Sequence, residues 1–165
     1  MGGFPPTGRA TTCDDSPRRH INPVSSSRPK AKFGGTGVRI VRSLDHLVLT
    51  VRDIEVSREF YNRVLGMEPL QFGNGRHALR FGEQKINLHE QGGEIVPNAA
   101  VATPGSADLC FLLNIPLPAM MRHLEANGVD IIDGPVPRTG ACGPIVSLYF
   151  RDPDGNLIEV SRATD

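Results

Sequence analysis

The feature of this sequence that most constrains its fold is a pattern of elements that occurs twice. In the first pass, an alternating β-branched run over 44–51 predicts a strand. Apolar pairs four residues apart over 54–65 predict a helix, which Asp53 begins and Gly66 ends. Three more strands are predicted between glycine-bearing turns, over 68–72, 78–81 and 85–89. The resulting order is β-α-β-β-β.

The second pass repeats this order after a polar linker over 91–106. A strand is predicted over 108–113, and Pro118 suits the start of a helix that Asn127 and Gly128 end. Three further strands are predicted over 129–132, 145–151 and 156–161. The repeat predicts an α+β fold in which modules 43–90 and 107–162 form a cupped mixed sheet around a cleft.

Composition separates this domain, placed at 42–163, from a basic segment over 1–41. Residues 1–42 hold eight Lys or Arg and two Asp, a net charge of +6, whereas the remainder has a net charge of −6. Because the segment is rich in Pro, Gly and Ser and poor in aliphatic residues, we expect a disordered N-terminal tail. A mitochondrial transit peptide is the alternative, which Asp14 and Asp15 disfavour. Otherwise we expect a cytoplasmic location.

Whole-chain composition excludes several classes of protein. The 18 basic side chains balance the 18 acidic ones, which argues against a nucleic-acid partner. No apolar run approaches the roughly 20 residues that span a bilayer, so no membrane partner is expected. The three cysteines form no CxxC pair and do not indicate a disulfide framework.

The repeat also predicts where chemistry can occur. Each module offers a polar residue near the start of its first strand and another on its last strand. These are His46 with Asn87 or His89 in the first module, and Asp108 with Glu159 in the second. Such side chains are ligands for Zn²⁺, Mn²⁺, Fe²⁺ or Ni²⁺. The alternative is that they are ordinary hydrogen-bonded or solvated strand residues.

The stretches 44–51, 60–67 and 149–159 resemble the vicinal oxygen chelate superfamily, the glyoxalase, bleomycin-resistance and dioxygenase group. Within it the likeness is to the branch of glyoxalase-domain and virulence proteins, and it extends through 85–90 and 134–140. The resemblance covers about three-quarters of the chain and implies the fold predicted above. It is less specific for activity, because one fold hosts many chemistries.

The resemblance implies a divalent metal ion, Zn, Ni, Mn or Fe, held by residues from both modules. His46 matches the ligand on the first strand, and Glu159 matches the ligand on the last. Asp108 stands where many members have His or Glu. For the fourth ligand we expect His89, with Asn87 as the alternative, because imidazole binds such metals better than an amide does.

The implied activity is a lyase or isomerase reaction on a small substrate with two adjacent oxygens, through an enediolate that the metal stabilises. A ligand carboxylate, Glu159 or Asp108, would act as general base. We expect Tyr149 to line the cleft and Arg138 to meet an anionic substrate, although Arg138 also fits a solvated loop. The alternatives are a metal-free protein that sequesters a small molecule and an extradiol-type dioxygenase. Because many relatives pair, the resemblance also implies a homodimer.

Overall fold

The computed structural model describes residues 40–164, so the predicted tail lies outside the described residues apart from Ile40 and Val41. The elements of the first module are β1 (His46–Val51), α1 (Ile54–Leu65), β2 (Glu68–Phe72), β3 (Arg76–Phe81) and β4 (Gln84–Glu90). Those of the second are β5 (Asp108–Leu112), α2 (Leu117–Ala126), β6 (Asp133–Gly140), β7 (Gly143–Arg151) and β8 (Leu157–Ala163). The predicted β-α-β-β-β order is therefore confirmed in both modules.

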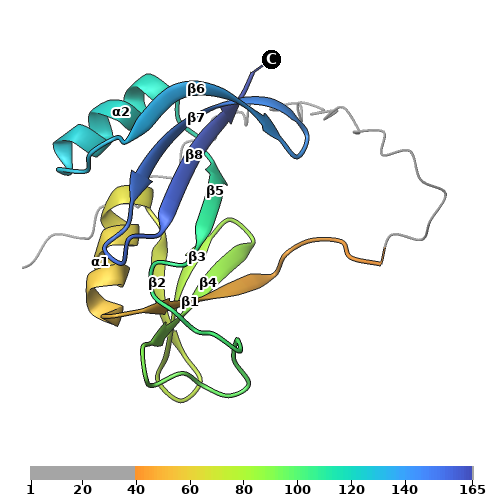
Figure 1. The fold of residues 1–165 in the computed structure, drawn as a ribbon, viewed down its shortest axis with the longest axis vertical. Helices are drawn as coiled ribbons and strands as arrows, with labels where there is room; N and C mark the ends of the chain where they lie inside the picture. Colours follow the sequence, from red (N-terminus) through yellow and green to blue (C-terminus); the bar gives the residue numbers. More distant parts are fainter. Residues whose placement is uncertain (1–39, 165) are drawn as a thin grey trace, which may run out of the picture. The chain divides into compact units, whose positions relative to one another are not determined.

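The strands form two sheets of four strands with the same topology (Figure 1). The strand orders are β1-β4-β3-β2 and β5-β8-β7-β6, so each first strand lies beside the last strand of its own module. That pair is parallel in both sheets, and the other pairs are antiparallel. The α+β class with mixed sheets is confirmed, although hydrogen bonding divides the strands into two sheets where one was expected.

Helix α1 begins and ends at the residues that the sequence indicates. The side chain of Asp53 accepts a hydrogen bond from the Val56 backbone N–H at 2.9 Å, which satisfies one unpaired donor of the first turn. Gly66 has a φ of 65°, the left-handed conformation in which the backbone of this helix ends.

Strand β6 lies later in the chain than expected. Residues 129–132 are not in a strand, and the third strand of the module is the Gly- and Pro-bearing segment Asp133–Gly140, which the sequence indicates as a loop. Because β6 is at the edge of its sheet, its proline nitrogens do not interrupt a central ladder. Pro137 lies opposite Val146, and Arg138 lies opposite Ile145.

A single apolar core joins the two modules. Leu79 and Ile86 of the first module are fully buried in the same cluster as Leu148 and Val160 of the second. The rings of Phe81 and Phe111, one from each module, meet edge to face with centroids 5.3 Å apart.

Polar contacts secure the same junction. The hydroxyl of Tyr61 on α1 donates to Asp152 at 2.8 Å, and the Arg52 guanidinium donates to Asp154 at 3.2 Å. Nε2 of His123 on α2 lies 3.1 Å from the carbonyl oxygen of Val64 at the end of α1. None of the helices in the described part of the chain is long and apolar enough to cross a membrane.

Candidate functional site

The face of each sheet that turns away from the core, here called the outer face, holds the predicted site residues. Along β8, Ile158 and Val160 point into the core, so Glu159 between them points the other way. Along β1, Leu49 and Val51 belong to the core, and His46 lies on the opposite face.

His46 opens β1 and is exposed. Its Nδ1 lies 2.7 Å from Oδ1 of Asp45, which leaves Nε2 as the nitrogen available to a ligand. The hydrogen bond from His46 lowers the pKa of Asp45, so the carboxylate stays ionised and orients the ring.

The pairing registers place two pairs of residues in equivalent positions. His46 lies opposite Lys85, two residues before Asn87 on β4. Asp108 lies opposite Leu157, two residues before Glu159 on β8. Each pair therefore consists of diagonal neighbours on parallel strands.

This equivalence makes Asn87, rather than His89, the counterpart of Glu159. His89 lies opposite Thr50, further along the same face. The register therefore favours Asn87, the alternative, over His89, the expected residue.

Oδ1 of Asn87 is buried and has no hydrogen-bond partner within the described residues. Nδ1 of His89 is likewise buried and without a hydrogen-bond partner among these residues. A buried polar atom without a partner is uncommon, so both atoms are candidates to contact a ligand.

Two buried hydroxyls hold Glu159. Oε1 of Glu159 accepts a hydrogen bond from Ser147 Oγ at 2.5 Å and is 3.2 Å from Ser161 Oγ. Both serines are 0% exposed, and they face each other across β7 and β8 with their oxygens 2.8 Å apart. No hydrogen bond from the described residues reaches Oε2 of Glu159.

Cys110 extends this cluster on β5. It lies opposite Glu159, and its Sγ is 3.3 Å from Ser161 Oγ. Desolvation raises the pKa of the Cys110 thiol. Its contact with the Glu159 side chain and the charges of Glu159 and Asp108 act in the same direction, and the contact with Ser161 acts against them. At neutral pH the thiol therefore keeps its proton and can donate.

Tyr149 and Arg138 lie beside Glu159 on the outer face. Tyr149 is directly opposite Glu159 in the register, and its hydroxyl accepts a hydrogen bond from Arg138 Nε at 3.0 Å. A second guanidinium nitrogen donates to Asp133 at 3.2 Å. The hydrogen bond to Tyr149 raises the pKa of Arg138, so this side chain stays cationic. The Tyr149 proton remains available to a ligand, because its oxygen acts as the acceptor here.

The four predicted ligands do not form one cluster within a single chain. Among residues 40–164, no three His, Cys, Asp or Glu side chains lie close enough together to hold one metal ion. The expectation that equivalent strands bring His46, His89, Asp108 and Glu159 to one shared cleft is not met by one copy. Each sheet instead presents one pair of candidate ligands, here called a half-site: His46 with Asn87, or Asp108 with Glu159.

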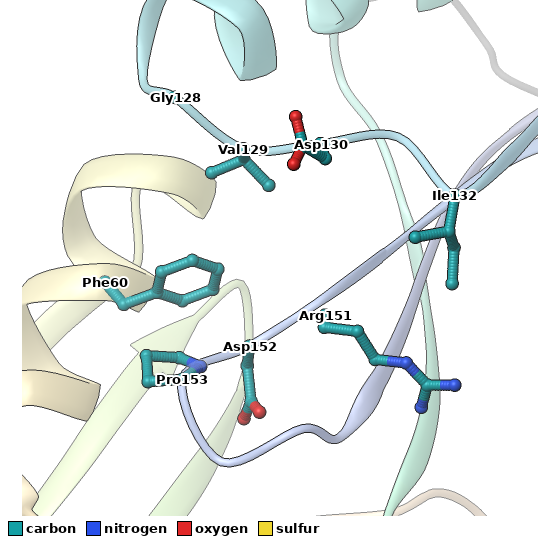
Figure 2. A pocket seen from close by; sticks show the side chains of 8 residues that line it. All are labelled: Phe60, Gly128, Val129, Asp130, Ile132, Arg151, Asp152 and Pro153. Atoms are coloured by element: carbon teal, nitrogen blue, oxygen red, sulfur yellow. The ribbon is translucent and has the colours of Figure 1, made fainter.

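A cavity of about 340 Å³ lies elsewhere, between α1, the segment after α2 and the turn after β7 (Figure 2). Figure 2 shows the ring of Phe60 on one side and the carboxylate of Asp130 across from it. None of the four predicted ligands lines this cavity. Asp152 in its wall accepts hydrogen bonds from Tyr61 and Asn156, which indicates a structural role.

The sequence analysis missed Ser147 and Ser161. Each is two residues from Tyr149 or Glu159 on the same strand, so the two-residue period alone places them on the outer face. Their contact with Glu159 depends on the register between β7 and β8, which a local pattern does not reveal.

Comparison with known proteins agrees with this architecture. The profile of the Glyoxalase/Bleomycin resistance protein/Dioxygenase superfamily matches residues 43–160. Glyoxalase domain-containing protein RDO1 of Mycosarcoma maydis is 54% identical over 125 residues, which are 76% of this chain and 70% of that protein. Virulence protein STM3117 of Salmonella typhimurium is 52% identical over 123 residues, which are 74% of this chain and 85% of that protein.

Solved structures give the same result. The crystal structure of STM3117 matches with a TM-score of 0.75 at 51% identity, covering 76% of this chain and 99% of that one. An integron cassette protein from V. cholerae matches with a TM-score of 0.75 at 55% identity, covering 78% of this chain and all of the other.

Proposed function

Because the chain belongs to the glyoxalase/bleomycin resistance/dioxygenase superfamily, we propose that it is a divalent-metal-dependent enzyme of glyoxalase-like type. Its substrate is a small molecule with two adjacent oxygens, and its reaction is a proton transfer of the lyase or isomerase kind. The observation that carries the proposal is the Glu159 carboxylate, which two buried hydroxyls hold on the outer face with one oxygen unengaged.

The donors of the two half-sites suit such a metal ion. An imidazole nitrogen and carboxylate oxygens are ligands for Zn²⁺, Ni²⁺, Mn²⁺ and Fe²⁺, and superfamily members often use divalent metals. The buried, unpartnered Oδ1 of Asn87 supports a ligand at this place. When bound, the ion supplies Lewis acidity to the adjacent oxygens of a substrate. His46, Asn87, Asp108 and Glu159 would hold it.

A complete ligand set takes residues from two copies of the chain. One copy presents the half-sites separately, and each contains fewer than the three protein ligands of a typical catalytic centre. Val48 and Leu112 on the two outer faces are exposed, with 45% and 72% of their surface accessible, which suits a face that another chain covers. We therefore place the active site between the half-sites of a homodimer.

The chain's own residues then have distinct roles. One of the two carboxylates of the second module, Glu159 or Asp108, accepts a carbon-bound proton of the substrate. Tyr149 donates its hydroxyl proton to a substrate oxygen, and the Arg138 cation beside it attracts negative charge.

Metal content tests the proposal on the purified, tag-free full chain. We expect about one ion per chain in the parent and its loss in a His46→Ala/Glu159→Ala double variant. Glu125→Ala, which removes an exposed carboxylate from α2, should keep the metal. A parent chain without metal, even after reconstitution, contradicts the proposal.

A second candidate function is metal-free sequestration of a small apolar molecule. The separation of the predicted ligands within one chain favours it, as do the exposed apolar side chains of the outer faces. Thermal unfolding distinguishes the two functions, because a protein without a metal site shows no metal-linked rise in Tm.

A further inference from the structure

We infer that Ser147 and Ser161 are positioning residues that hold Oε1 of Glu159 and leave Oε2 as its single reactive oxygen. The inference rests on the proposed function, because it concerns a carboxylate that would bind the metal. It adds residues that touch neither metal nor substrate and act through Glu159.

Distances and burial carry the first step. The bond from Ser147 Oγ to Glu159 Oε1 is 2.5 Å, at the short end of the range for a hydroxyl that donates to a charged oxygen. Both serines are fully buried, so water does not compete for these bonds. A carboxylate with one oxygen held in this way has a fixed orientation and presents the other oxygen outward.

Counting protons gives the direction of the bonds. Each hydroxyl has one proton, so Ser147 cannot donate to both Glu159 and Ser161. The distances are satisfied when Ser147 donates to Glu159 and Ser161 donates to Ser147 at 2.8 Å, with Glu159 Oε1 as the second, more distant acceptor of the Ser161 proton at 3.2 Å. Ser161 Oγ then has a lone pair for the Cys110 thiol at 3.3 Å.

The result is a chain of donors that runs from Cys110 through Ser161 and Ser147 to Glu159. Hydrogen bonds in series polarise one another, so the last bond is strengthened by those behind it. The expected effects are therefore ordered, with the largest at Ser147, a smaller one at Ser161 and the smallest at Cys110. A purely structural role for the serines predicts no such order in metal affinity.

The test measures the dissociation constant for Zn²⁺ by competition with a chromophoric chelator, on the full chain. Loss of an outer-shell partner costs about 10–100-fold in metal affinity, so we expect a loss of this size in Ser147→Ala and a smaller loss in Ser161→Ala. Ser147→Thr keeps the hydroxyl and should bind close to the parent. The matched control is Ser57→Ala, because Ser57 is equally buried and its hydroxyl has no partner within the described residues.

A second readout is the visible spectrum of the Co²⁺-loaded protein, whose d–d bands should change in Ser147→Ala because Glu159 is free to turn. Parent-like affinity in Ser147→Ala, with binding abolished in Glu159→Ala, overturns the inference and leaves the proposed function intact. A parent that binds no Zn²⁺ overturns the proposed function and the inference with it. If Ser147→Ala does not fold, parent-like affinity in Ser161→Ala overturns the inference, and an intermediate loss supports it.

Discussion

At the scale of single residues, Tyr61 shows how burial fixes a protonation state. The side chain is 0% exposed, and its hydroxyl donates to Asp152 inside the junction between α1 and the turn after β7. Desolvation raises the pKa of Tyr61 well above its ordinary value of 10.0, and the Asp152 carboxylate acts in the same direction. The folded protein therefore keeps a proton that the unfolded chain releases above pH 10.

This difference in proton binding between the folded and unfolded states predicts that the free energy of unfolding falls at alkaline pH. Below pH 10 both states hold the Tyr61 proton, so the contribution to stability is complete. As the pH rises above 10, the unfolded chain binds fewer protons than the folded one, and the free energy of unfolding falls by about 1.4 kcal/mol per pH unit. Tyr61→Phe should remove this slope, at a cost of about 1–2 kcal/mol at pH 7 from the lost hydrogen bond.

Urea unfolding at pH 7 and at several values above pH 10 measures both effects. Ser57→Ala on the same helix serves as the control and should keep the parent's alkaline slope. Equal slopes in the parent and in Tyr61→Phe would show that Tyr61 does not carry this linkage.

At the scale of elements, the end of α1 depends on one backbone conformation. Gly66 has a φ of 65°, and nothing lies within 4 Å of a Cβ placed there. Substitution by Ala therefore costs only backbone strain, about 1 kcal/mol in the free energy of unfolding. Gly93→Ala is the matched control, because its φ is outside the left-handed region and its Cβ would make ordinary contact at 3.6 Å. Thermal or urea unfolding should show the loss in Gly66→Ala alone, and equal losses would contradict this account.

The elements that the sequence predicts well are those with local signals. Asp53 and Gly66 bound α1, and alternation identifies β1 and β8, so these elements agree with the structure. Strand β6 has no such signal, since its Gly and Pro residues indicate a loop and only its place at a sheet edge makes them tolerable.

The candidate site shows the same difference between local sequence signals and long-range contacts. The two-residue period places His46 and Glu159 away from the core, as the structure has them. The choice between Asn87 and His89 depends on the register between β1 and β4, a contact between residues far apart in sequence. The hydrogen bond from Ser147 to Glu159 depends in the same way on the register between β7 and β8.

At the scale of the whole molecule, the two modules share a core and yet keep their half-sites apart. Tyr61 and Arg52 hold the turn between β7 and β8 against the first module, so the junction has little freedom to rearrange. The metal centre that we propose would therefore take its ligands from two copies, with His46 of one chain beside Glu159 of the other.

Mixing two inactive variants tests this arrangement. Consider a two-fold dimer of one His46→Ala chain and one Glu159→Ala chain. One of its two sites then contains both substitutions, and the other site contains neither. Random pairing then restores about a quarter of the parent's metal sites, whereas sites built within single chains would stay defective in every molecule. The measurement is Zn²⁺ bound per chain after the variants are unfolded together and refolded. Each variant refolded alone is the control, and no gain on mixing would rule out sites shared between copies.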